Sequence, residues 1–261
     1  MRFLFLFLSF FGWSCVQTSG PLLLAGGGHL PATFFEKGIQ LAQKNEVHVL
    51  IFPQASQREE SGSESAEVWL KAGGATTHVA DLSSPEGSTV TLQEIQNADI
   101  LWFTGGSQLR LMKAVQNAQI LPAIQHRWKQ GAVVGGTSAG AAAMGTLMIS
   151  GAPQPKPYVK GAMAAHDGLG LCPQFLVDQH FTQRNRNHRL LTAVLDHPDV
   201  IGLGISESTA LIIQGDTAVV WGDGPVHLYD ARHADVTSMK EGQSAKHLSF
   251  TLLKTDDTFS W

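Results

Sequence analysis

The segment Ala132-Val133-Val134-Gly135-Gly136-Thr137-Ser138-Ala139-Gly140 is the most informative part of this sequence for the architecture of the chain. A G-x-S-x-G pentapeptide stands there between a strand-like apolar run, 132–135, and a helix-like run of small residues, 139–148. A strand that turns sharply into a helix strains its central residue, and only small neighbours let the two backbone arms pass closely. The stretch therefore predicts a nucleophile elbow with Ser138 at its tip, and the alternative is a tight turn that carries a serine by chance.

Apolar runs and helical stretches alternate around this pentapeptide. The predicted strands are 22–25, 47–52, 76–80, 100–103 and 132–135, and the predicted helices are about 33–44, 63–72, 108–116 and 121–129. Such alternation is typical of an α/β domain with a doubly wound, mostly parallel sheet and flanking helices. The runs 210–213, 218–221 and 226–229 have no helix between them and predict an antiparallel C-terminal extension. Residues 151–166, with three prolines, predict a loop near the site, and a lid is one interpretation of it.

Two backbone amides are candidates for an oxyanion hole. The helix after Ser138 points its free N–H groups back toward the serine, so the amide of Ala139 can donate to an oxyanion on an attacked carbonyl. Gly105 and Gly106 follow the strand at 100–103. Because glycines let backbone N–H groups approach a ligand closely, we expect Gly106 to be the second donor.

A serine needs a base, and His180 is the histidine whose context stands out among eleven. It lies where an extended segment from Phe175 ends and a helix from about Asn185 begins. The basic residues that follow it are Arg184, Arg186 and Arg189. Arginines at the positive end of a helix oppose the helix dipole, so we expect an anion beside them. A solvated basic helix start is the alternative.

These motifs resemble those of a known family. The four motifs are 105–110, 136–141, 178–181 with the three arginines, and 204–207 with Thr209 and Ala210. In this order they resemble the cyanophycinases, in the peptidase E clan of serine peptidases, which have a class I glutamine amidotransferase-like fold. The resemblance implies Ser138 as nucleophile, His180 as general base and Glu207 as the acid that orients it. It also implies a homodimer, and Gln108 as a substrate-contacting glutamine, with a helix cap as the alternative for Gln108.

The resemblance also implies a substrate. Cyanophycin is a polyaspartate whose side chains carry arginine through isopeptide bonds, and the family releases β-aspartyl-arginine dipeptides from it. Guanidinium groups pair with carboxylates, so Arg184, Arg186 and Arg189 are predicted to bind the free carboxylate of a β-linked aspartyl group. The family's acidic pair is replaced here by Gly28-His29, and the acids beside the catalytic glutamate by Ser206 and Ser208. An isoaspartyl peptidase of other specificity, a non-peptidase esterase-like hydrolase and a binding protein without catalysis therefore stay alternatives.

Composition and the N-terminus complete the prediction. The 18 basic and 22 acidic residues of this 261-residue chain give no reason to expect nucleic-acid binding, and we expect no metal or cofactor. Met1-Arg2 and the apolar run that follows predict a signal peptide over 1–20, one α/β peptidase domain over 21–261, and a secreted or periplasmic location. The apolar core is too short to span a bilayer. Cys15 leaves lipidation open, which is the one route by which we expect a membrane contact.

Overall fold

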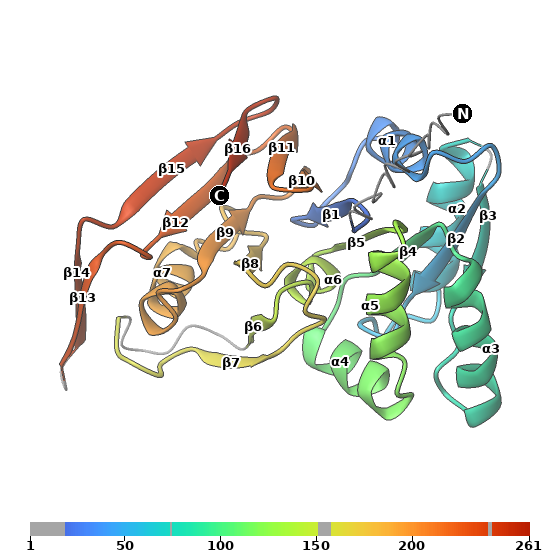
Figure 1. Cartoon of the computed structure of the whole chain (residues 1–261), viewed down its shortest axis with the longest axis horizontal. Helices are drawn as coiled ribbons and strands as arrows, with labels where there is room; N and C mark the ends of the chain where they lie inside the picture. The colour runs from blue at the N-terminus through green and yellow to red at the C-terminus, as the bar shows by residue number, and fades with distance from the viewer. Residues whose placement is uncertain (1–18, 74, 151–157, 240–241) are drawn as a thin grey trace, which may run out of the picture.

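A computed structural model describes residues 19–73, 75–150, 158–239 and 242–261 (Figure 1). Most of the predicted signal peptide and residues 151–157 of the predicted loop lie outside these ranges. No helix among the described residues combines the length and the apolar character that a membrane crossing needs.

An eight-stranded sheet forms the centre of the molecule, in the order β16-β11-β10-β1-β5-β4-β2-β3. Its parallel strands are β1 (Leu22–Ala25), β5 (Val133–Thr137), β4 (Ile100–Phe103), β2 (Val47–Phe52) and β3 (Ala75–Val79). Antiparallel strands extend it beyond β1, namely β10 (Thr209–Gln214), β11 (Thr217–Gly222) and β16 (Thr258–Ser260). The prediction of an α/β fold with a large, mostly parallel sheet is confirmed.

Helices cover both faces of this sheet. Neighbouring side chains of a strand point to opposite faces, so Leu23 packs with Phe34, Trp69 and Trp102, while Leu24 packs in a separate cluster with Val115. The first layer contains α1 (Ala32–Ala42) and α2 (Ser61–Lys71); the second contains α3 (Pro85–Asn97), α4 (Gln108–Asn117) and α5 (Leu121–Lys129).

A second, four-stranded sheet lies beside the first, in the order β15-β12-β9-β8 (Figure 1). It consists of β15 (Ser249–Leu253), β12 (Val226–Asp230), β9 (Ile201–Ile205) and β8 (Phe175–Gln179), with α7 (Asn187–Asp196) against it. Two two-stranded antiparallel sheets complete the fold, β6 (Leu147–Ser150) with β7 (Ala164–Asp167), and β13 (Asp235–Met239) with β14 (Gly242–Lys246).

Three sequence predictions need correction. The C-terminal extension is right for β10 and β11, but β12 leaves for the second sheet after the chain turns at Gly222, where φ is 110°. The helix after Ser138 ends after four residues, α6 (Ala139–Ala142). The backbone crowds Gly145, where a Cβ would lie 2.6 Å from the carbonyl oxygen of Phe175, and the apolar run beyond it pairs as β6. The expected loop over 151–166 includes part of the strand β7.

Candidate active site

Ser138 occupies a strained turn between β5 and α6. Its φ of 53° and ψ of −112° are costly for a residue with a side chain, and its N–H donates to the carbonyl of Ala25 at 2.9 Å. A Cβ on Gly140 would lie 2.2 Å from the carbonyl oxygen of Phe103, and one on Gly136 would lie 2.7 Å from the Gly140 backbone. The small residues are therefore required by the close approach of strand and helix.

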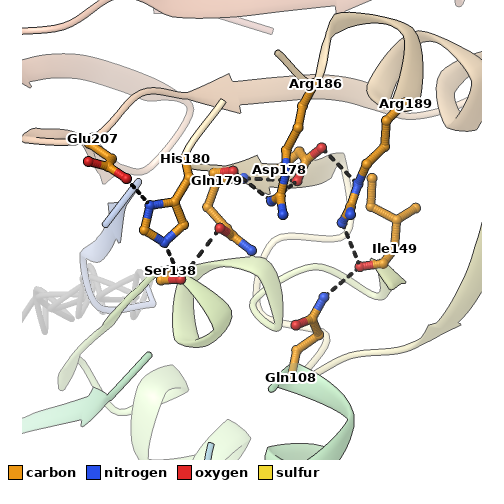
Figure 2. Close-up of polar contacts among 9 residues, drawn as sticks. All are labelled: Gln108, Ser138, Ile149, Asp178, Gln179, His180, Arg186, Arg189 and Glu207. Atoms are coloured by element: carbon orange, nitrogen blue, oxygen red, sulfur yellow. Dashed lines mark hydrogen bonds and ion pairs between the residues drawn. The ribbon is translucent and has the colours of Figure 1, made fainter. Parts of the chain in front are cut away.

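Ser138, His180 and Glu207 form a continuous chain of contacts (Figure 2). The Oγ of Ser138 lies 2.8 Å from Nε2 of His180, and Nδ1 of His180 lies 2.5 Å from Oε1 of Glu207. A carboxylate only accepts hydrogen bonds, so Nδ1 carries the ring proton and Nε2 presents its lone pair to the serine. The histidine side chain is 13% exposed and the glutamate side chain 35%, so the chain of contacts runs from the interior to the surface.

Three consecutive carbonyls at the end of β1 hold the three segments that carry these residues. The carbonyls of Ala25, Gly26 and Gly27 accept from the N–H groups of Ser138, His180 and Ser208, at 2.9, 2.8 and 2.8 Å. Ser138 and His180 are thus held by their own backbone N–H groups, and Glu207 is held by the N–H group of the next residue, Ser208. The end of β1 therefore aligns the site through its main chain.

A second set of contacts joins the histidine and glutamate segments. Oε1 of Gln183 accepts from the Glu207 N–H at 3.0 Å, and the hydroxyls of Thr182 and Ser206 lie 2.5 Å apart. Sequence reasoning assigned no role to Gln183 or Thr182, although both lie between His180 and Arg184 in the sequence. Gln179, which precedes His180, was missed in the same way, and its Oε1 lies 3.4 Å from the Ser138 hydroxyl.

Burial lowers the pKa of His180 below its ordinary value of 6.5. The hydrogen bond that His180 donates to Glu207 raises this pKa, while the charge of Arg184 lowers it further. A base must be neutral to accept a proton, so activity is lost as pH falls through the His180 pKa. We expect the acidic limb of kcat/KM to have its midpoint below pH 6.5. Removing a nearby cation in Arg184→Ala should move the limb toward higher pH, whereas Lys71→Ala, on α2, should leave it in place.

The three arginines after His180 have different surroundings. Nη1 of Arg186 lies 2.9 Å from Oδ1 of Asp178 and donates to the Gln179 carbonyl at 2.7 Å, and Nε of Arg189 lies 3.1 Å from Oδ2 of Asp178. Arg184 is exposed. The helix begins at Asn187, two residues later than predicted. The anion expected beside this helix start is thus present within the chain as Asp178, and contact of these arginines with substrate stays a prediction.

Asp178 is expected to be important for stability, because its side chain is 1% exposed and faces two guanidinium groups. Asp178→Asn keeps the shape but leaves two largely buried cations facing a neutral amide, which should cost about 3–5 kcal/mol in the free energy of unfolding. Asp230→Asn is the matched control, since Asp230 pairs with an Arg232 side chain that is 36% exposed, and it should cost about 1 kcal/mol or less. Urea denaturation measures both, and equal losses would contradict the expectation.

Gln108 lies beside this network. Its Nε2 donates to the carbonyl of Ile149 at 2.7 Å, and that carbonyl also receives Nη2 of Arg189 at 3.4 Å (Figure 2). The alternative that Gln108 caps α4 is wrong, because the cap is Ser107, whose hydroxyl accepts from the Arg110 N–H. Figure 2 shows that α4, β6, α7 and β8 are connected by polar contacts that end at Ser138. A substrate contact of Gln108 stays a prediction.

Of the two residues expected to form an oxyanion hole, Ala139 follows Ser138 directly and Gly106 follows Gly105, and donation by either amide stays a prediction. Ala139 is the first residue of α6, so its N–H has no partner within the helix. Gly106 is exposed, and a Cβ on its neighbour Gly105 would lie 3.7 Å from the Ser138 hydroxyl. No group of three or more metal-ligating side chains occurs among the described residues.

A large α/β sheet that presents a serine, a histidine and a carboxylate in this order of contact is typical of the serine hydrolases. The model of peptidase family S51 matches residues 22–221 of the chain. The chain therefore belongs to peptidase family S51 and is a serine peptidase, as the motifs predicted.

Relatives with names and a solved structure agree with this family. The cyanophycinase of Geminocystis herdmanii is 34% identical over 73% of this chain and 72% of its own length. The peptidase E of Pasteurella multocida is 29% identical over 52% of this chain and 59% of its own length. The crystal structure of a peptidase from an acI-B1 Actinobacterium has a TM-score of 0.70, with 21% identity over 94% of this chain and 98% of that one. It shows the same fold.

Proposed function

We propose that this serine peptidase is an exopeptidase that hydrolyses cyanophycin or related β-aspartyl peptides through an acyl-enzyme on Ser138. The observation that carries the proposal is the unbroken contact from Ser138 through His180 to Glu207, at 2.8 and 2.5 Å, on a strained turn. We interpret that turn as a nucleophile elbow.

The first half of the reaction follows from these contacts. The Ser138 oxygen attacks the carbonyl carbon of the scissile amide while Nε2 of His180 takes its proton, and the carbonyl electron pair moves onto oxygen. The N–H groups of Gly106 and Ala139 donate to that oxyanion. When the carbonyl re-forms, the C–N bond breaks and the leaving amine takes the proton from His180. Glu207 stabilises the imidazolium that exists between these two proton transfers.

Water completes the second half. His180, neutral again, takes a proton from a water molecule that attacks the acyl ester, and a second tetrahedral intermediate forms with its oxyanion at the same two amides. Collapse breaks the bond to the serine oxygen, which recovers its proton from His180. The products are a free carboxylic acid and the resting enzyme, so no cofactor is needed in either half.

Positive charge near the serine supports an acidic substrate. Arg184 and Arg186 both act on the pKa of His180, which means that their charges are felt at the reacting group. One carboxylate, Asp178, faces two guanidinium groups, Arg186 and Arg189, so the cluster keeps a positive charge when all three are ionised. A β-linked aspartyl unit has an additional free carboxylate that such a charge attracts, while an ordinary peptide has none at that position. In cyanophycin it belongs to the attached arginine, and in an isoaspartyl peptide it is the aspartyl α-carboxylate.

Preference for arginine on the β-linked aspartyl side chain is expected to be weak. Gly28 and His29 are exposed where the family has acids, and Ser208 lies beside them, with its N–H bonded to Gly27. Ser206 bears less on this point, because it is fully buried against Thr182. Loss of opposite-charge pairing changes selectivity by roughly ten- to a hundredfold, at 1.4 kcal/mol for each factor of ten.

A matched substrate panel tests the proposal. We expect cyanophycin and short polyaspartate peptides whose side chains carry β-linked arginine, lysine or leucine to be cleaved, and an α-linked Asp-Arg peptide and a nitrophenyl ester to be poor substrates. The terms β-linked Asp-Arg, Asp-Lys and Asp-Leu denote these peptides, because the free β-aspartyl-arginine dipeptide is the product of the proposed reaction. Equal kcat/KM on α- and β-linked Asp-Arg would overturn the β-aspartyl assignment, and better turnover of the ester would favour an esterase. A preference for arginine over lysine above about a thousandfold, or ~4 kcal/mol, would show that other acids bind the basic group.

Three further points stay predictions. Export to a secreted or periplasmic location rests on the pattern of residues 1–20, and lipidation at Cys15 is its alternative. The homodimer rests on the resemblance alone. Mass spectrometry of the exported protein identifies its N-terminus and any lipid, and sedimentation measures the oligomeric state.

A further inference from the structure

A tight turn after β2 lies directly behind Gly106. Residues 53–56 form this turn, in which the Ser56 N–H donates to the Pro53 carbonyl at 2.8 Å. The side chain of Gln54 ties it to the end of β3 by donating to the Ala80 carbonyl at 2.8 Å. A Cβ on Gly106 would lie 2.0 Å from the Ala55 oxygen and 2.9 Å from the Ser56 nitrogen. The backbone of Gly106 therefore rests against this turn with no room for a side chain.

The Ala55 carbonyl is held by two donors from the start of α4. The Ser107 N–H donates to it at 2.8 Å, and Nη1 of Arg110 donates to it at 2.6 Å. Arg110 is partly buried, and a hydrogen bond from a charged donor is roughly twice as strong as a neutral one. Because Ser107 directly follows Gly106, the two bonds fix both the turn and the peptide unit that it supports.

We propose that Arg110 is a positioning residue for the oxyanion donor Gly106, acting through the Ala55 carbonyl. The inference rests on the proposed function, since it requires that the Gly106 N–H meets an oxyanion. An oxyanion donor is effective only within about 2.7–3.1 Å of the oxygen that develops charge, so a small relaxation of the turn weakens it. The φ of Gly106 is 140°, a conformation open to glycine that nothing in its own side chain restrains. Contact with the pinned turn supplies that restraint.

Arg110→Ala is predicted to weaken stabilisation of the transition state and to leave binding of the substrate largely unchanged. Arg110→Ala frees the Ala55 carbonyl from one of its two donors while leaving Ser138, His180 and Glu207 in contact. Removing an oxyanion donor altogether lowers kcat by about 10²–10³, so misalignment of one should lower it by roughly ten- to a hundredfold. We expect KM for β-linked Asp-Arg to change less than about threefold, because only interactions made in the transition state are lost.

The experiment compares three variants on two probes. Arg110→Ala and Arg110→Lys are compared with Arg127→Ala, a matched control in which another partly buried arginine loses a 2.7 Å bond to a backbone carbonyl, that of Ala98. The first probe is β-linked Asp-Arg. The second is its analogue with an aldehyde in place of the scissile carbonyl, to which the serine oxygen adds so that the aldehyde oxygen occupies the oxyanion position. Arg110→Ala should lower the affinity for the aldehyde by the same factor as it lowers kcat. Arg110→Lys should recover part of both losses, and Arg127→Ala should leave the affinity and kcat unchanged.

Two results would overturn the inference. One is an Arg110→Ala variant that matches Arg127→Ala in kcat and aldehyde affinity; the other is a loss that appears in KM with aldehyde affinity unchanged. If Arg110→Ala does not fold, Arg110→Lys gives the same readouts with the charge retained. Failure of the proposed function itself appears separately, as turnover that survives in Ser138→Ala or as an aldehyde affinity in that variant that stays above its affinity for the substrate.

Discussion

Ser138→Ala is expected to lower kcat by about a millionfold while the protein keeps its fold. Alanine cannot form the acyl ester, and it removes the Oγ contacts to His180 and Gln179 at 2.8 and 3.4 Å. The strained turn is not held by the hydroxyl, since the Ser138 N–H bond to Ala25 remains. We therefore expect a small change in stability, measured by thermal unfolding, and near-normal substrate binding, measured by titration with β-linked Asp-Arg. The loss in kcat is measured by turnover of the same substrate.

Ser150→Ala is the matched control. The Ser150 hydroxyl also lies 2.8 Å from a histidine Nε2, that of His166, in the two-stranded sheet of β6 and β7. No carboxylate is hydrogen-bonded to His166 among the described residues, and Ser150 follows no strained turn. If contact with a histidine were enough to make a serine a nucleophile, both substitutions would lower activity. Near-normal activity of Ser138→Ala, or an equal loss in Ser150→Ala, would contradict the serine mechanism proposed here.

Gly27→Ala should abolish most activity through His180. A Cβ on Gly27 would lie 2.4 Å from Cε1 and 2.7 Å from Nε2 of the imidazole, so the ring has to move away from Ser138. Misplacing a reacting group by about 1 Å can cost 10²-fold, and this clash is larger, so we expect kcat to fall at least that far. The measurement is kcat on β-linked Asp-Arg, together with the free energy of unfolding.

Gly131→Ala separates this clash from backbone strain. Gly131 has a φ of 102° against 101° for Gly27, but nothing lies within 4 Å of its Cβ position. Both variants carry the same conformational penalty, which is of order 1–3 kcal/mol. A loss of activity in Gly27→Ala that Gly131→Ala reproduces would mean that strain, and not displacement of His180, is the cause.

Local patterns predicted the central sheet well. The strands at 22–25, 47–52 and 100–103 and the helix at 121–129 have the predicted bounds, because buried parallel strands are short continuous apolar runs. Helix α3 was missed although Ser84 caps it and Pro85 begins it, since only Thr91 and Ile95 are buried and the apolar periodicity is weak. Here the capping signal was more informative than the hydrophobic pattern.

The site residues that belong to a sequence motif were predicted, whereas the contacts between segments that are distant in the sequence were not. The sequence indicated that the basic helix start needs an anion, but not that Asp178, buried at the end of β8, would supply it. The partner of Gln108 is a backbone carbonyl, that of Ile149, on the strand β6, whose first two residues were predicted as helix. Every residue has a backbone carbonyl, so the identity of a side chain does not indicate which carbonyl accepts a hydrogen bond. The sequence alone therefore had no means of finding the contacts of Ala55 or Gly26.

The three carbonyls at the end of β1 make catalysis a late event in folding. Their partners at Ser138, His180 and Ser208 are each more than a hundred residues away along the chain. Closing such long loops costs entropy before any contact compensates for it, and contacts between distant residues slow folding. The site exists only once the first strand has been joined by segments from the middle and the last third of the sequence. Hydrolytic activity is therefore a reporter of the completed chain, and a partly folded intermediate that has formed its helices should not yet cleave peptides.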